Sequence, residues 1–222
     1  MPIREMMNRF SLRTCAALVA LGWTAATTAS AQTTKPSDQA ATKSAAKPAE
    51  KQPATWAAAV ERVARAAEKG DLDGVTAALS RDASVRTIEE DDRVPPIAMA
   101  ATASDWTLLG THAYEFPPAS LAGDIAADVN RSDLVSDKDK QKIVPLDDVE
   151  LARANTTAAE WLARTVGAER DSLVGVAVYW NVKTNRPMFV LVKGQPITGG
   201  GFAVTQAVYG DPMQRRATAA AR

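Results

Sequence analysis

The sequence predicts an α+β domain in which helices come first and an antiparallel meander of strands comes last. Apolar residues recur at helical spacing after Trp56, and Gly70 ends that stretch. In Leu173–Trp180 every second residue is valine or tryptophan, a spacing that places these side chains on one face of a strand. The connections after it are short or glycine-rich, so the last strands are expected to pair as hairpins.

A pair of helices is expected at the start of the domain. The first runs from Trp56 to Lys69, and the second is capped by Asp71 and runs to Leu79. After these helices, the sequence predicts a strand over 83–88 and a solvated turn at the acidic run 89–92. Pro95-Pro96 is expected to interrupt regular structure, and residues 97–103 fit either a helical turn or a strand.

The centre of the chain combines one strand with two helices. Trp106–Phe116 fits a strand, and alternation places five of its residues on one face: Trp106, Leu108, Gly110, His112 and Tyr114. A helix is expected from Ser120 to Val129, followed by a charged, irregular stretch over 132–145. Asp147 and Glu150 form the acidic version of a capping box for a helix that ends at Gly167.

Three strands close the domain and form the predicted meander. Leu173–Trp180 leads through a tight turn at Asn185 to Met188–Lys193, and a glycine-rich loop over 194–201 leads to Phe202–Tyr209. The tryptophans of the domain fall on apolar stripes of these elements, which favours the core over a carbohydrate platform: Trp56, Trp106, Trp161 and Trp180.

Residues 1–31 have the organisation of a secretory signal peptide. Arginines precede an uncharged apolar run over 15–26, and Ala29-Ser30-Ala31 matches a signal-peptidase site. The apolar run is shorter than the roughly 20 residues of a spanning helix, so cleavage is favoured over a retained anchor. We therefore expect a periplasmic or extracellular protein with a disordered Pro/Ala/Lys linker at 32–53, a single domain at 54–213 and a flexible tail at 214–222.

Removal of the signal peptide changes the chemistry available to the chain. Cys15 is the only cysteine, so the mature protein is expected to form no disulfide and to offer no thiolate to a metal. Residues 54–213 carry 16 basic and 23 acidic residues, a net charge of −7, whereas the whole chain is neutral. Nucleic-acid binding requires clustered basic residues and is not expected.

His112 is the only histidine and the best candidate for acid–base chemistry. It shares a predicted strand face with Tyr114, and Asp124 and Asp128 share a helix face at i, i+4 shortly afterwards. If that helix crosses the strand, a carboxylate can orient the imidazole for proton transfer. The alternative is that both aspartates point to water, because Leu121, Ile125 and Val129 define the buried side of the helix, and that His112 is merely half-buried. His112, Tyr114 and Asp128 are thus the catalytic candidates.

Other chemistries fit the sequence less well. A calcium loop starting at Asp128, with Asn130, Ser132 and Asp139 as further ligands, lacks the glycine required at its sixth position, which is Asp133. No serine lies in a nucleophile elbow. The glycines at 199–201 precede a strand, whereas a phosphate cradle requires a helix. We expect no metal and no cofactor.

Residues 66–75 (Ala-Ala-Glu-Lys-Gly-Asp-Leu-Asp-Gly-Val) and the closing strands resemble the nuclear-transport-factor-2-like (SnoaL-like) superfamily. The resemblance covers Trp56–Ile88 and Leu173–Asp211, and the helix over 148–166 has no counterpart. It implies a strongly curved, cone-like sheet around an apolar pocket that serves isomerisation, hydration or plain binding. It carries over no catalytic residue.

The preferred interpretation is an exported, non-enzymatic module that binds an unknown protein or small molecule. The alternative is a small-molecule pocket enzyme, isomerase- or hydratase-like, of the superfamily just named. A homodimer and a retained membrane anchor are left open. The two main functions differ on whether an acid converges with His112 in a protected site.

Overall fold

The computed structural model describes residues 53–88, 93–144 and 147–212. The expected signal peptide, most of the linker, the acidic run at 89–92 and the tail lie outside these residues. Six helices and five strands follow one another within them: α2 (Trp56–Glu68), α3 (Leu72–Ala78), β1 (Leu79–Thr87), α4 (Pro96–Ala103), β2 (Thr107–Glu115), α5 (Leu121–Arg131), α6 (Asp137–Ile143), α7 (Asp148–Val166), β3 (Leu173–Asn181), β4 (Arg186–Pro196) and β5 (Phe202–Gly210).

The strands form one open mixed sheet in the order β1-β5-β4-β3-β2. β3, β4 and β5 pair antiparallel in turn, as the predicted meander requires, whereas the antiparallel pairing of β2 with β3 and the parallel pairing of β1 with β5 were not predicted. The sheet does not close into a barrel, so β1 and β2 are its two edges. The predicted α+β class is confirmed.

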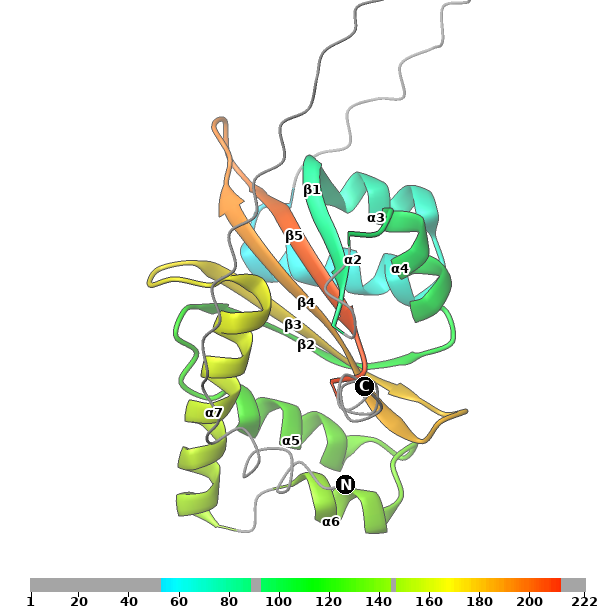
Figure 1. The fold of residues 1–222 in the computed structure, drawn as a ribbon, viewed down its shortest axis with the longest axis vertical. Coiled ribbons are helices and arrows are strands. Elements are labelled where there is room, and N and C mark those ends of the chain that lie inside the picture. Colours follow the sequence, from blue (N-terminus) through cyan, green and yellow to red (C-terminus); the bar gives the residue numbers. More distant parts are fainter. Residues whose placement is uncertain (1–52, 89–92, 145–146, 213–222) are drawn as a thin grey trace, which may run out of the picture.

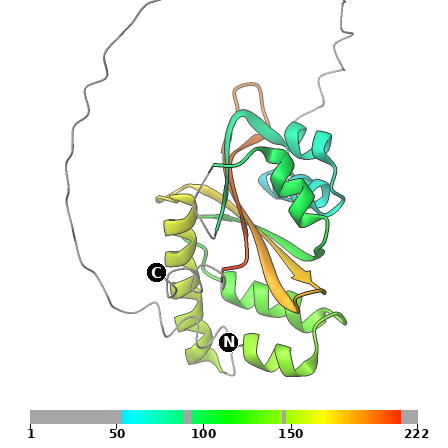
Figure 2. The same cartoon turned by 45° about the vertical axis from the view of Figure 1, so that its right-hand side comes forward.

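Helices cover both faces of the sheet (Figures 1 and 2). Residues of α2, α3 and α4, such as Val63, Val75 and Met99, form one core with Tyr179 and its neighbours on that face. α5 and α7 form a second core on the opposite face, where Leu121 and Leu162 meet the valines of β3, and α6 adds a smaller cluster around Trp180. The molecule is therefore a three-layer arrangement in which β4 is the middle strand and β3, between β4 and β2, is buried from Val174 to Trp180.

Local signals set the helix ends as expected. The Asp71 side chain accepts a hydrogen bond from the Gly74 amide at the start of α3, and Asp147 accepts one from the Glu150 amide at the start of α7. Gly167 follows α7 with φ +60°, the left-handed conformation that glycine adopts without strain. No helix among the described residues is long and apolar enough to span a membrane.

The sequence-based elements are wrong in three places. Pro95-Pro96 does not interrupt structure but starts α4, because proline is tolerated in a first helical turn that has no amide partner. The charged stretch after α5 contains α6, whose first turn is capped by the Ser136 hydroxyl. β1 starts at Leu79, earlier than residue 83.

Candidate functional site

The site lies where α5 packs on the edge strand β2. His112 Nε2 and Asp128 Oδ2 are 2.6 Å apart, and the Arg131 guanidinium donates to the other carboxylate oxygen over 2.6 Å. The Asp128 side chain is only 2% exposed, whereas those of His112 and Arg131 are 18% and 73% exposed. A buried carboxylate is thus held between a partly buried imidazole and a cation at the surface.

The pairing fixes the roles of the two imidazole nitrogens. An ionised carboxylate only accepts hydrogen bonds, so Nε2 carries the hydrogen and donates to Asp128. Nδ1 has no protein partner among the described residues, yet every buried side-chain nitrogen and oxygen in them has one. Nδ1 therefore contacts solvent and is the free hydrogen-bonding atom of the site.

A glycine opposite Asp128 makes its burial possible. A Cβ on Gly110 would overlap the Asp128 carboxylate, although the Gly110 backbone is not in the left-handed region. The register of β2 against β3 shifts between Leu108 and Gly110, which is a β-bulge. The absent side chain and the bulge together seat the carboxylate against the strand.

The bulge corrects the predicted faces of β2. Alternation places Leu108 and Trp106 on the face of His112, but both pack with α2 on the opposite side of the sheet. Leu109 packs instead with the α5 and α7 side. Because of the extra residue in the bulge, the side chains before Gly110 lie on the opposite side of the sheet from the one that simple alternation predicts. The side of β2 that carries His112 is therefore left for polar contacts with α5.

Tyr114 and Asp124 form a second pair beside the first, two residues further along β2 from His112 and four residues before Asp128 in α5. The Tyr114 hydroxyl donates to Asp124 Oδ2 over 2.7 Å, and the Ser120 hydroxyl donates to the same oxygen over 2.7 Å. The His112 and Tyr114 rings stack at an interplanar angle of 22°, with centroids 6.3 Å apart. Residues two apart in a strand and residues four apart in a helix each share a face, so the two rings of β2 meet the two carboxylates of α5.

The second pair shifts the ionisation of both partners. Burial, followed by the hydrogen bond to Asp124 and the nearby carboxylates, raises the pKa of Tyr114 far above its ordinary value. Burial alone would raise the pKa of Asp124, but the hydrogen bonds from Tyr114 and Ser120 and the charge of His112 lower it below its ordinary value. At neutral pH Tyr114 is therefore a protonated donor to an ionised Asp124.

The structure brings all the predicted acid–base residues together. The expectation that both aspartates point to water is wrong for Asp128, which lies on the margin of the apolar stripe of α5 and is buried by β2. Sequence reasoning missed Gly110 and Arg131 as parts of the site. The i, i+3 spacing of Asp128 and Arg131 on one helix was the available signal for the second.

The calcium-loop alternative does not fit this arrangement. Asp128 is inside α5 and engaged by His112 and Arg131, while Asp139 is bonded to Ser136, Lys142 and Asn185 near the β3–β4 turn. No group of three or more His, Cys, Asp or Glu side chains that could hold a metal ion is found in the part of the chain that the structure describes.

Comparisons with known proteins find no relative of this chain. No protein-family model matches the chain, and neither the curated proteins nor the solved structures include a significant match. The resemblance to the nuclear-transport-factor-2-like superfamily stays a prediction, and function has to be argued from the site.

Proposed function

We propose that the chain is an exported, non-enzymatic binding module whose recognition surface is the polar site formed by β2 and α5. The observation that supports this most directly is that the chain's own donors occupy both carboxylates. Asp128 accepts from His112 and Arg131, and Asp124 accepts from Tyr114 and Ser120. The acids fix α5 to the strand, and the solvent-facing Nδ1 of His112 is what the site presents to a ligand.

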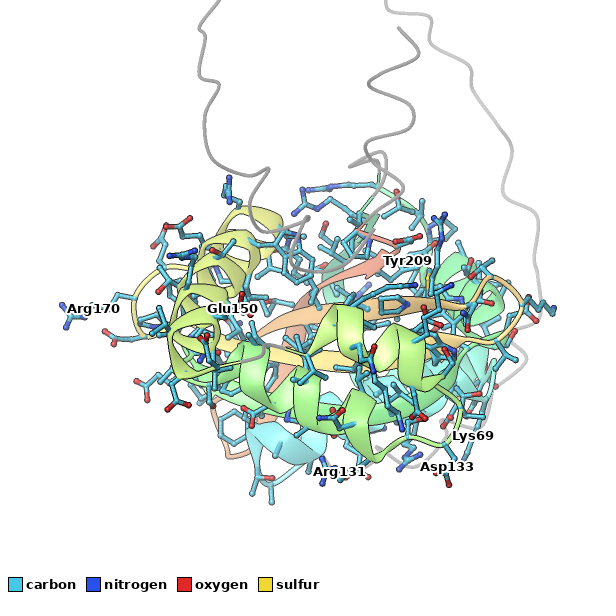
Figure 3. The ribbon with its side chains drawn as sticks, turned by 90° about the horizontal axis from the view of Figure 1, so that it is seen from below. Lys69, Arg131, Asp133, Glu150, Arg170 and Tyr209 are labelled. Carbon is cyan, nitrogen blue, oxygen red and sulfur yellow. The ribbon has the colours of Figure 1, made fainter. Side chains whose placement is uncertain are left out.

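The ionisation of Tyr114 supports binding over proton transfer. Its raised pKa keeps the hydroxyl protonated and donating to Asp124, so Tyr114 is a poor general base at neutral pH. The exposed guanidinium of Arg131 lies at the C-terminal end of α5, on the side of the molecule that also carries Lys69 and Asp133 (Figure 3). Rigid polar groups beside an accessible imidazole suit recognition of a polar ligand or partner.

The experiment compares the NMR spectrum of the His112 imidazole before and after addition of extracts from the compartment in which the protein resides. Small-molecule and macromolecular fractions are added separately while the ¹⁵N resonances of the ring are followed. Binding at the site is expected to shift Nδ1 and the amides of α5, and His112→Gln is expected to remove the response. An Arg153→Ala variant on the exposed side of α7 is the matched control. A response that survives His112→Gln would place the ligand elsewhere.

A second candidate is acid–base catalysis by His112. One observation favours it: a buried carboxylate holds Nε2 and leaves Nδ1 to solvent, which is how a general base is oriented. Turnover of a small molecule that is lost in His112→Gln and reduced in Asp128→Asn would establish the enzyme. Ligand binding without chemical change would favour the binding module.

Export is the part of the proposal that rests on residues 1–31 alone. We expect mass spectrometry of the protein recovered from outside the cytoplasm to give Gln32 as the N-terminal residue. An N-terminus at Met1 on membrane-bound protein would instead indicate a retained anchor.

A further inference from the structure

The outer side of edge strand β2 carries peptide groups without a partner. The Phe116 amide donates to the Ser172 carbonyl, so Phe116 points its backbone toward β3. Backbone direction alternates along a strand, and it follows that Gly110, His112 and Tyr114 bond β3 while Thr111, Ala113 and Glu115 face outward. None of these three amides donates to a protein group elsewhere in the described residues.

The start of the same edge is closed by a side chain. Glu68 at the end of α2 accepts a hydrogen bond from the Leu108 amide over 2.8 Å, before the bulge. The same bond shows that the Leu108 amide points away from β3. The open part of the edge is therefore 111–115.

The other edge of the sheet is protected, which makes the open one distinctive. The Val94 amide donates to the Val85 carbonyl on the outer side of β1, and Arg93 forms a bridge with Arg86. The first half of β1 is irregular, with a register shift between Leu79 and Ser84. Natural sheets block edges by such devices, and an unblocked edge is a template for a further strand.

We infer that β2 receives an extended peptide segment of a partner protein, which adds to the sheet as a sixth strand along 111–115. This inference rests on the proposed function and specifies its ligand. Backbone bonds to Thr111, Ala113 and Glu115 would supply affinity, and side chains on the α5 face of the segment would lie beside His112 and Tyr114.

The layers of the fold favour a single segment over a second copy of the chain. α5 packs on β2 from one face and α2 packs on β2 and β3 from the other. Pairing β2 with β2 of another copy would place the two strands about 4.8 Å apart. Antiparallel pairing would also bring both α5 helices to the same face of the joined sheet, where they would compete for space that a bare segment leaves open.

The negative charge of the domain favours a basic peptide segment over an acidic one. Residues 54–213 carry a net charge of −7, and Glu115 lies exposed at the end of the open edge. A segment that alternates β-branched residues with lysine is thus complementary to this surface, and an acidic segment is not.

The test measures amide exchange at the edge in the chain that starts at Gln32. The probe is a peptide of nine residues, the length of β2, in which Val or Thr alternates with Lys, and its counterpart carries Glu in place of Lys. The lysine peptide is expected to slow exchange at Thr111, Ala113 and Glu115 and to bind about tenfold more tightly than the counterpart. Exchange that neither peptide slows, or that both slow equally, would overturn the inference.

Proline substitutions separate strand addition from other binding. Thr111→Pro removes an outward donor and is expected to weaken the lysine peptide at least about fivefold. Glu115→Pro provides a second variant at an exposed strand end, and Asp82→Pro, in the unpaired part of β1, is the control that should leave binding unchanged. Equal affinities in all three variants would refute strand addition.

Three further outcomes also contradict the inference. Protection of 111–115 that appears only with dimer formation would assign the edge to a second copy. Protection present without peptide and lost on deletion of 32–52 would assign it to the linker. If the His112 ring responds to an extract while these amides do not, the proposed function stands and strand addition fails.

Discussion

Gly110→Ala tests whether the absence of a side chain at position 110 of β2 is what allows the Asp128 carboxylate to pack against this strand. The backbone of Gly110 is not in the left-handed region, and the three atoms nearest to a new Cβ all belong to the Asp128 carboxylate, which it would overlap. Displacing that carboxylate breaks a partly buried hydrogen bond to His112, worth about 1.5–3 kcal/mol, and a largely exposed one to Arg131, worth about 0.5 kcal/mol. We expect the free energy of unfolding to fall by about 2–4 kcal/mol.

The assay is urea unfolding of the substituted chain and of a double-mutant cycle with Asp128→Ala. Asp128→Ala removes the three atoms nearest to the new methyl group, so Gly110→Ala is expected to cost at least about 1.5 kcal/mol less in that background. Gly123→Ala in α5 is the matched control, because its Cβ meets Leu151 at an ordinary 3.5 Å. It should stabilise the protein by about 0.5–1 kcal/mol. An equal cost of Gly110→Ala with and without Asp128 would refute the reasoning.

Three further experiments test the Tyr114–Asp124 hydrogen bond, the pH dependence of stability and the capping of α7. Tyr114→Phe removes a donor to Asp124, so the pKa of Asp124 is expected to rise toward its ordinary value and stability to fall by about 1 kcal/mol, as read by carboxyl NMR and urea unfolding. The pKa values of Asp124 and Asp139 are lowered in the folded state, so their stabilisation is complete above the unfolded carboxyl pKa of about 3.9 and is lost as the pH falls through the folded values. Unfolding at a series of pH values should show this loss, and Asp124→Asn should make it shallower; no difference between the two chains would contradict the assignment. Asp147→Ala removes the cap of α7 and is expected to cost about 1 kcal/mol, clearly more than Asp148→Ala, which removes no capping bond.

Elements defined by local chemistry were predictable from the sequence. Asp71 and Asp147 cap helices through their own neighbours, and the faces of β3 and β4 follow from strict alternation of large apolar residues. The same holds for α2, whose glycine terminator at position 70 has φ +62°. These features depend on residues a few positions apart, which is the range that a sequence pattern reports.

Features set by distant partners were not predictable. The β2 bulge depends on Glu68, which bonds Leu108 from another element, and on Gly110, which admits a carboxylate from α5. The parallel pairing of β1 with β5 joins residues at opposite ends of the domain. The acid–ring pairing at His112 followed from the spacing of two and four, but its burial required knowing that α5 packs on the strand.

Amide hydrogen exchange along β2 in the ligand-free chain tests the recognition surface most directly. An open edge predicts alternation: Gly110, His112 and Tyr114 exchange slowly because they bond β3, and Thr111, Ala113 and Glu115 exchange fast because they face solvent. Uniformly slow exchange across 110–115 would show that the edge is already covered and would contradict a free binding surface at β2.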